Sequence, residues 1–190
     1  MVSTVKRCEW VPEHKPSYVK YHDEEWGVPV YDDNKMFEFL VLESFQAGLS
    51  WEIVLNKRDN FRKAFSNFDF NKVAKFDESK VQSLLQDAGI IRNQLKIRAT
   101  INNAQRYIEV RQEFGSFCEY FWGFTGGKPI SNTFKKLGDI PASTVLSDDI
   151  AKDLKKRGFK FLGTTVIYAH MQAVGMVNDH QTSCFRYNEV

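Results

Sequence analysis

The sequence predicts an all-α protein. Several segments repeat their apolar residues every three to four positions, which is the period of a helix, and capping residues or glycine bound these segments. The alternation of apolar and polar residues that marks a strand is weak throughout the chain. With 190 residues, 43% of them apolar and 26% charged, the composition is that of a globular protein with one sizeable core.

The first predicted elements are an arm and a buried helix. The residues up to about Asp33 contain three prolines and little periodicity, so we expect an irregular or short-helical arm. A helix is predicted over 34–47, because Asp32, Asp33 and Asn34 offer N-caps and Gly48 follows its end. Apolar residues surround most of this helix, which predicts that it is buried.

The middle of the chain predicts two helices joined by a short hairpin. The first is capped by Asp77 and stops at Gly89, and the second runs over about 93–112. A short aromatic helix over 117–124 and a loop over 126–129 follow.

Two further helices complete the expected fold. Ser147 is predicted to cap a helix with acidic residues in its first turn and basic residues in its last turn, ending at Gly158. The last core helix is predicted over 164–174.

Four potential metal ligands lie near the two ends of the chain. Cys8 and His22 belong to the arm, and His180 and Cys184 lie near the C-terminus. Two Cys and two His can bind zinc tetrahedrally, and such an ion is structural because no coordination position stays open. On one helical turn, His180 and Cys184 would share a face. The spacing is not specific for a metal site and also fits a free surface thiol with separately satisfied histidines, and His14 is an alternative to His22.

Glu43 is an acidic residue on an otherwise apolar stripe of the helix over 34–47. A buried carboxylate must be paired, face a cavity or serve a function; alternatively this helix is less buried and Glu43 reaches water. Near it in the sequence stand Gln46 and a set of aromatic residues that form either core or a stacking pocket: Trp10, Tyr18, Tyr21, Trp26 and Trp51. A carboxylate beside such rings suits a flat, positively charged ligand.

The hairpin from Ala88 to Arg92, followed by Lys96, has the layout of a helix–hairpin–helix motif. The backbone at Gly89 and the next helix N-terminus can dock a DNA phosphate in such a motif. An ordinary pair of helices fits the same pattern, and Ile91 stands where the motif usually has a second glycine. The net charge of only +2 does not indicate nucleic acid, and the basic cluster over 152–160 fits a solvated helix end.

Composition also bears on the compartment. Three cysteines are too few for a disulfide framework and fit a reducing environment. The segment from Met1 to Trp10 lacks the apolar core of a signal peptide, and no apolar run approaches the ~20 residues that cross a bilayer. We therefore expect a cytoplasmic protein without a membrane segment.

Long and uneven motifs of the chain resemble the 3-methyladenine DNA glycosylase I family. They are CEWV at 8–11, YHDEEWGVPVYDD at 21–33, LESFQAGLSWEIVLNKR at 42–58, QDAGIIRNQLKI at 86–97, KKRGFKFLGTTVIYAHMQAVGMVNDH at 155–180, and Cys184. In this order they span nearly the whole chain. The resemblance implies a single helix–hairpin–helix glycosylase domain over 1–190, with one lobe from 1–33 and 163–190 and a second over 34–162.

The resemblance also implies site residues. Matched motif by motif, one structural zinc ion per chain is held by Cys8, His22, His180 and Cys184, and it joins the two ends. The spacing from Cys8 to His22 is one residue longer than the family's, which puts the assignment of Cys8 in doubt. A base pocket contains Glu43 as its catalytic group and is lined by Trp10, Tyr18, Tyr21, Trp26, Gln46 and Trp51. Gly48 and Leu49 contact DNA, with Leu49 filling the gap left by a flipped base; the hairpin adds Gly89, Arg92 and Lys96.

The expected reaction is the hydrolytic excision of 3-methyladenine from double-stranded DNA that contains alkylated bases, leaving an abasic site. Methylation at N3 makes the base positively charged and hence a good leaving group, so selection and electrostatic support matter more than a strong acid or base. Three alternatives stay open: a DNA-binding module without activity, a zinc hydrolase, and a glycosylase for another lesion such as 3-methylguanine. We expect a monomer.

Overall fold

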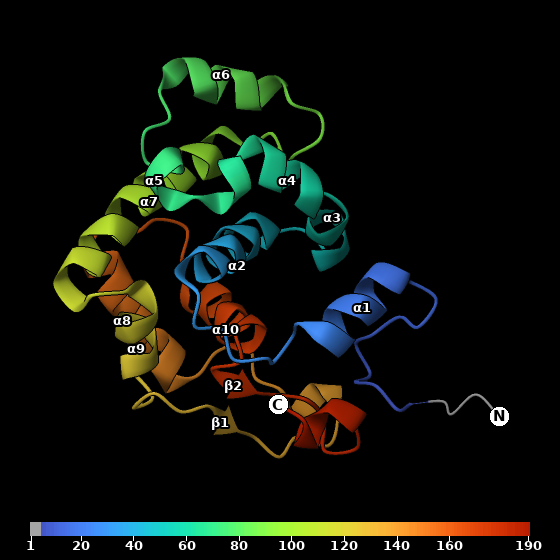
Figure 1. Ribbon diagram of the computed structural model, residues 1–190. Coiled ribbons are helices and arrows are strands. Elements are labelled where there is room, and N and C mark those ends of the chain that lie inside the picture. The colour runs from blue at the N-terminus through green and yellow to red at the C-terminus, as the bar shows by residue number, and fades with distance from the viewer. Residues whose placement is uncertain (1–4) are drawn as a thin grey trace.

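The fold is described from a computed structural model, which describes residues 5–190 (Figure 1). Residues 1–4, the start of the expected arm, lie outside the described part. Between residues 5 and 190 the elements are almost all helical, so the all-α prediction is confirmed. The helices are α1 (Pro16–Glu24), α2 (Asp33–Gln46), α3 (Trp51–Asn56), α4 (Arg58–Ala64), α5 (Phe70–Val73), α6 (Glu78–Gln86), α7 (Gln94–Phe114), α8 (Phe117–Gly123), α9 (Val145–Lys156) and α10 (Thr164–Ala173), with short 3-10 turns η1 (Ser66–Phe68), η2 (Leu137–Asp139) and η3 (Phe185–Asn188).

Local capping chemistry sets most of the helix starts. The Asp32 side chain accepts a hydrogen bond from Lys35 N at 2.8 Å, and Asp77 and Asn93 cap α6 and α7 in the same way. The predicted N-cap of α9, Ser147, was wrong. Thr144 is its N-cap, and Ser147 is the third residue of a capping box with Thr144.

Helix α2 forms the centre of the core. Every residue from Met36 to Phe45 is buried, including Glu43, which confirms the predicted burial of this helix. Helix α10 packs against both α2 and α9. The contact between α2 and α10 joins two strongly apolar helices in the middle of the molecule.

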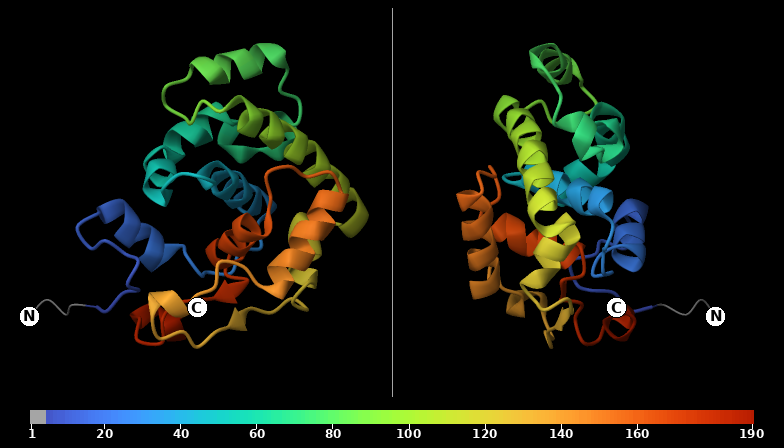
Figure 2. Two further views of the ribbon diagram at one scale, coloured as in Figure 1. Left: turned by 180° about the vertical axis from the view of Figure 1, so that it is seen from behind. Right: turned by 60° about the vertical axis from the view of Figure 1, so that its left-hand side comes forward.

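The arm that follows residue 5 lies beside the C-terminal segment. The N-terminal arm with α1 and the C-terminal segment occupy one end of the molecule, and α4, α5 and α6 lie at the other end (Figures 1 and 2). Phe185 N donates a hydrogen bond to Lys6 O at 2.9 Å, which joins the arm to the C-terminal segment. Two short parallel strands, β1 (Ile130–Ser131) and β2 (Val177–Asn178), pair Ile130 with Val177.

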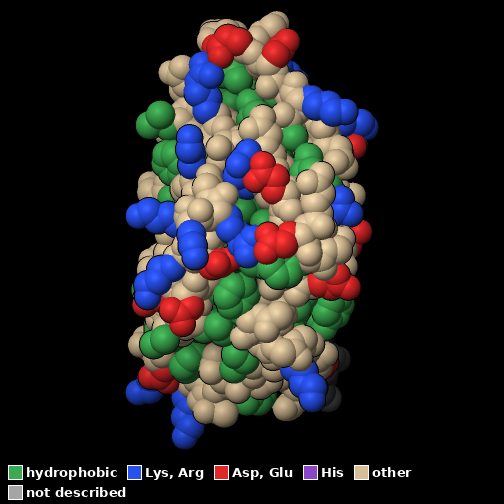
Figure 3. All heavy atoms as spheres, turned by 90° about the vertical axis from the view of Figure 1, so that its left-hand side faces the viewer, with side chains coloured by type: hydrophobic (Ala, Val, Ile, Leu, Met, Phe, Trp, Pro, Cys, Tyr) green, Lys and Arg blue, Asp and Glu red, His purple; other side chains and the backbone are tan. Residues whose placement is uncertain are grey.

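The described surface carries both signs of charge. On the face shown in Figure 3, Lys and Arg side chains are interspersed with Asp and Glu, above an apolar area in the lower half. Among residues 5–190 there is also no helix with the length and apolar character that a bilayer crossing requires.

Candidate functional site

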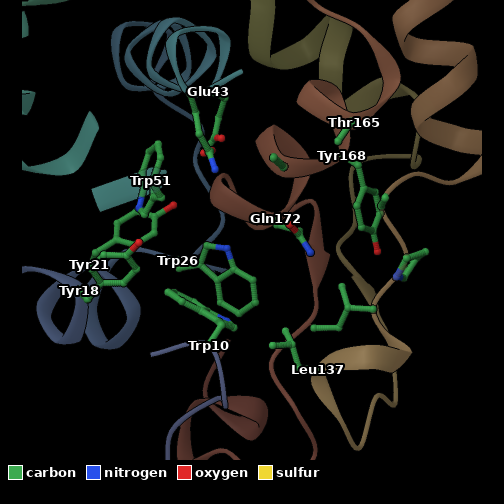
Figure 4. Close-up of a pocket in the computed structure, with 15 residues that line it drawn as sticks. Trp10, Tyr18, Tyr21, Trp26, Glu43, Trp51, Leu137, Thr165, Tyr168 and Gln172 are labelled. Carbon is green, nitrogen blue, oxygen red and sulfur yellow. The ribbon is translucent and has the colours of Figure 1, made fainter. Parts of the chain in front are cut away.

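A cavity of about 430 Å³ lies between α1, α2, α3, α10 and the η2 segment. All seven side chains that the sequence analysis assigned to the pocket line it: Trp10, Tyr18, Tyr21, Trp26, Glu43, Gln46 and Trp51. The opposite wall was not predicted, because its residues lie far away in the sequence: Leu137, Ile140, Pro141, Ala142, Thr165, Tyr168, Ala169 and Gln172. Figure 4 shows Glu43 pointing from α2 toward the hollow, with Trp51 and Tyr21 on one side and Gln172 and Tyr168 on the other.

Short-range spacing brings the predicted residues to the cavity. Tyr18 and Tyr21 are three residues apart on α1, and so are Glu43 and Gln46 on α2, which places each pair on one helix face. The chain then turns at Gly48, whose φ of +80° favours glycine, and α3 begins with Trp51.

Aromatic rings form one continuous wall. Trp10 meets Trp26 edge to face with ring centroids 5.0 Å apart, and Tyr21 lies 5.1 Å from Trp51. The indole Nε1 atoms of Trp10 and Trp51 are buried without a hydrogen-bond partner among the described residues. The wall therefore combines flat apolar surfaces with donors that are still free.

Glu43 is buried but unpaired. It is 5% exposed, and no described residue makes a hydrogen bond or salt bridge with its carboxyl group. Burial raises the pKa of Glu43 from 4.5 to about 8. The pKa of Tyr21 is also raised, mainly by burial and to a smaller extent by the charge of Glu43. The alternative in which Glu43 reaches bulk water is thus wrong. An empty cavity favours the neutral acid, whereas a cation in the cavity would favour the carboxylate.

A buried ion-pair network fixes α1 against α2 and α4. Arg58 donates two hydrogen bonds of 2.8 Å to Glu25, just after α1, and one of 2.8 Å to Glu38 on α2. Burial opposes the ionisation of Glu25, but the hydrogen bonds and charge of Arg58 bring its pKa down to about 2. Since α1 carries Tyr18 and Tyr21, this network holds the aromatic wall in place.

The four predicted metal ligands form one buried cluster. Ligand atoms of Cys8, His22, His180 and Cys184 all lie within 4.8 Å of one another. The Cys8 Sγ–His180 Nδ1, Cys184 Sγ–His22 Nε2 and Cys184 Sγ–His180 Nδ1 distances are 3.5, 3.5 and 3.6 Å. Tetrahedral bonds of ~2.0–2.3 Å separate neighbouring ligands by about 3.5 Å, so the cluster has the dimensions to hold a metal ion.

The second nitrogen of each histidine has its own partner. His22 Nδ1 lies 2.7 Å from Asp23 Oδ1, and His180 Nε2 lies 3.0 Å from the carbonyl oxygen of Trp26. Such partners orient a metal-binding imidazole and leave its other nitrogen free to coordinate. His14, the alternative ligand, is exposed and lies outside the cluster.

The expectation of a helical turn between His180 and Cys184 was wrong. The segment is irregular, and a turn with a Cys184 N to Gln181 O hydrogen bond of 2.7 Å brings the two side chains together. The four-residue spacing therefore serves the same purpose with a different backbone.

The residues assigned to DNA contact fall into two groups. Gly48, Leu49 and Arg92 are exposed, and Leu49 lies in the turn between the cavity residues Gln46 and Trp51. Gly89 N–H already donates to Asp87 Oδ1 at 2.7 Å. Lys96 is buried, and its ammonium donates to Phe45 O at 2.9 Å and Ala47 O at 2.6 Å, so it caps the C-terminal end of α2 from inside the protein.

A second hairpin lies between α9 and α10, directly after the basic cluster for which the sequence predicted a solvated helix end. Phe161 at its tip is exposed and has a φ of 59°, which is unusual for a residue other than glycine. Asn103 on α7 holds this hairpin through two 2.8 Å hydrogen bonds with the backbone of Lys160. The hairpin leads directly into α10, whose first turn contributes Thr165 to the cavity.

Comparisons with known proteins agree with this geometry. The family model described as methyladenine glycosylase matches residues 10–187. DNA-3-methyladenine glycosylase 1 of Escherichia coli is 49% identical over 96% of this chain and 97% of its own length, and DNA-3-methyladenine glycosylase of Haemophilus influenzae is 43% identical over 94% and 96%.

Solved structures give the same result. A crystal structure of 3-methyladenine DNA glycosylase I has a TM-score of 0.92 and 50% identity, covering 95% of this chain and 98% of that one. The Staphylococcus aureus enzyme, whose structure addresses 3-methyladenine recognition, has a TM-score of 0.88 and 34% identity, covering 90% and 91%.

Proposed function

Because this chain belongs to the methyladenine glycosylase family, we propose that it is a monofunctional hydrolase that excises 3-methyladenine from double-stranded DNA. The observation that supports this most directly is Glu43, a buried acid that has no partner among the described residues and lines an aromatic cavity of about 430 Å³. A cavity of this kind suits a flat cation. An N3-methylated adenine in DNA is such a cation.

The base enters the cavity after rotation out of the duplex, which costs a few kcal/mol and costs least for a damaged base. Tyr21 and Trp51 stack on the base, and Glu43 accepts a hydrogen bond from its adenine edge. The positive charge of the base favours the ionised form of Glu43, so binding and ionisation support each other. This coupling selects a charged lesion over neutral adenine.

The chemical step then needs little acid or base assistance. The bond between C1′ of the sugar and the base nitrogen breaks, and its electron pair neutralises the base. A water oxygen bonds to C1′ and loses a proton to solvent, which leaves an abasic sugar. Glu43 stabilises positive charge on the base and, as it develops, on the sugar.

The DNA contacts in this proposal come from loops between helices. Leu49 fills the gap left by the flipped base, with Gly48 allowing the close approach of the backbone. Arg92 and the hairpin at Gly89 contact phosphates, and the exposed hairpin around Phe161 adds a second docking point at the N-terminus of α10. Lys96 serves this surface from inside, by holding the end of α2 that leads into Gly48.

We assign the buried Cys2His2 cluster to one structural zinc ion. The donor set is typical of zinc, and four protein ligands leave no position for catalysis. The ion ties the arm over 1–33 to the segment over 163–190, so these two segments form one lobe of a single domain, with 34–162 as the other. A cytoplasmic monomer remains our expectation from the sequence.

The decisive experiment incubates the purified protein with DNA treated with a methylating agent and separates the released bases by chromatography. Release of free 3-methyladenine, with loss of that release in Glu43→Gln, supports the proposal. Binding to DNA without any released base would show a damage-binding module. Release that depends on added metal without a change in folding would show a metal hydrolase.

A further inference from the structure

Across the cavity from the aromatic wall lies a carboxylate with no cationic partner. Asp179 is fully buried, and no described lysine or arginine forms an ion pair with it. It accepts three hydrogen bonds instead: from Tyr168 Oη at 2.6 Å and Gln172 Nε2 at 2.8 Å on one oxygen, and from Asn132 Nδ2 at 2.7 Å on the other. Tyr168 and Gln172 line the cavity.

These contacts decide which end of the Gln172 amide faces the cavity. A carboxylate only accepts hydrogen bonds, so the NH2 end of Gln172 must turn to Asp179. The carbonyl oxygen Oε1 is then the free end, and no described residue donates to it. The hydroxyl hydrogen of Tyr168 is likewise committed to Asp179, which leaves only its lone pairs.

The cavity therefore presents acceptors on two sides. Glu43 offers a carboxyl group from α2, and Gln172 offers a carbonyl oxygen from α10 (Figure 4). A ligand that fits between them needs hydrogen-bond donors or positive charge at its edge. The 6-amino group of an adenine is such a donor, whereas a guanine in the same pose would direct its O6 lone pairs at an acceptor.

We propose that Gln172, held in this orientation by Asp179, is a specificity-determining residue that selects adenine-type over guanine-type bases. Asp179 acts as a positioning residue, since it reaches the base only through Gln172. The inference rests on the proposed function and deepens it, because it names the edge of the base that the second wall reads.

The test compares the binding of free 3-methyladenine and free 3-methylguanine, followed through the fluorescence of the cavity tryptophans. Gln172→Leu removes the acceptor. The Kd of 3-methylguanine divided by the Kd of 3-methyladenine is expected to fall roughly tenfold toward unity in this variant, because the guanine O6 no longer faces the Gln172 carbonyl oxygen without a donor between them. Asp179→Asn frees the amide to reverse and is expected to shift the ratio in the same direction. Excision of the two bases from methylated DNA should show a parallel change.

Tyr107→Phe is the matched control. It removes a 2.8 Å hydrogen bond from a buried tyrosine hydroxyl to Asp33 O, and neither residue lines the cavity, so it lowers stability without a change in the Kd ratio. Circular dichroism and metal content establish that each variant is folded. A Kd ratio for Gln172→Leu within twofold of the wild-type value overturns this inference. Wild-type protein that releases no 3-methyladenine from methylated DNA would instead overturn the proposed function.

Discussion

Replacing Glu43 with glutamine removes the ionisable group from the cavity and keeps its shape. The ordinary pKa of the side chain is 4.5, and burial raises it to about 8 in the folded protein. Between these two values the native state keeps a proton that the unfolded chain has released. The free energy of unfolding of the wild type therefore decreases as the pH rises from about 4.5 to about 8.

The size of the effect follows from this interval. One pKa unit corresponds to about 1.36 kcal/mol. At pH 7, which is 2.5 units above the ordinary pKa of 4.5, this relation predicts that Glu43→Gln is more stable than the wild type by about 3 kcal/mol. The same calculation predicts a gain of about 1.4 kcal/mol at pH 5.5 and about 4.5 kcal/mol at pH 8.5.

Denaturant unfolding of both proteins at these three pH values measures the gain. Taking the difference between variants removes the pH dependence of the metal cluster, which both share. Glu24→Gln, at an exposed position at the end of α1, is the control and is expected to change stability by less than about 0.5 kcal/mol at each pH. A gain for Glu43→Gln that does not grow with pH would show that Glu43 is not held as a neutral acid.

Three further predictions concern other parts of the structure. Cys184→Ser is expected to bind less than one metal ion per chain, by metal analysis, and to have a Tm lower by several degrees, by calorimetry. If the variant keeps one metal ion per chain, the ligand set is different. His170 is fully buried, and neither ring nitrogen has a hydrogen-bond partner in the described part of the chain. Burial lowers its pKa to about 3, so stability that is present above pH 6.5 is lost as the pH falls. His170→Phe should remove about 2 kcal/mol of this loss at pH 5, and an unchanged acid unfolding profile would contradict it. Leu49→Ala should slow excision about tenfold while free 3-methyladenine binds as before, and an equal loss in both assays would place Leu49 in the base pocket instead.

Much of the site was accessible from the sequence because its first wall is local. Five of its residues come from the first third of the chain: Tyr18, Tyr21, Glu43, Gln46 and Trp51. Helix periodicity alone places Tyr18 with Tyr21 on one helix face, and Glu43 with Gln46 on another. The second wall could not be predicted in this way. Thr165 and Gln172 share no spacing with Glu43, and only the packing of α10 on α2 brings them to the same cavity. Leu137 reaches the cavity from the separate η2 turn.

Lys96 shows where a sequence pattern misleads. A lysine after a hairpin is typical of a phosphate contact, and nothing in the local sequence distinguishes it from a surface residue. In the folded protein it meets the open carbonyl groups at the end of α2, some fifty positions earlier in the chain. The assignment of a charged side chain to surface or interior depends on which distant backbone groups need a partner.

The sequence by itself determined the helical class, the Asp77 cap of α6, the three candidates that include the Asp32 cap of α2, and the residue types of the metal cluster and aromatic wall. Each of these depends on contacts within a few residues or on the chemistry of a side chain. Only the tertiary structure decided that Glu43 has no partner among residues 5–190, that Lys96 lies inside, and that Asp179 turns the Gln172 carbonyl toward the cavity. Burial and hydrogen-bond pairing are properties of the packed core, in which residues far apart in the chain compete for the same donors and acceptors.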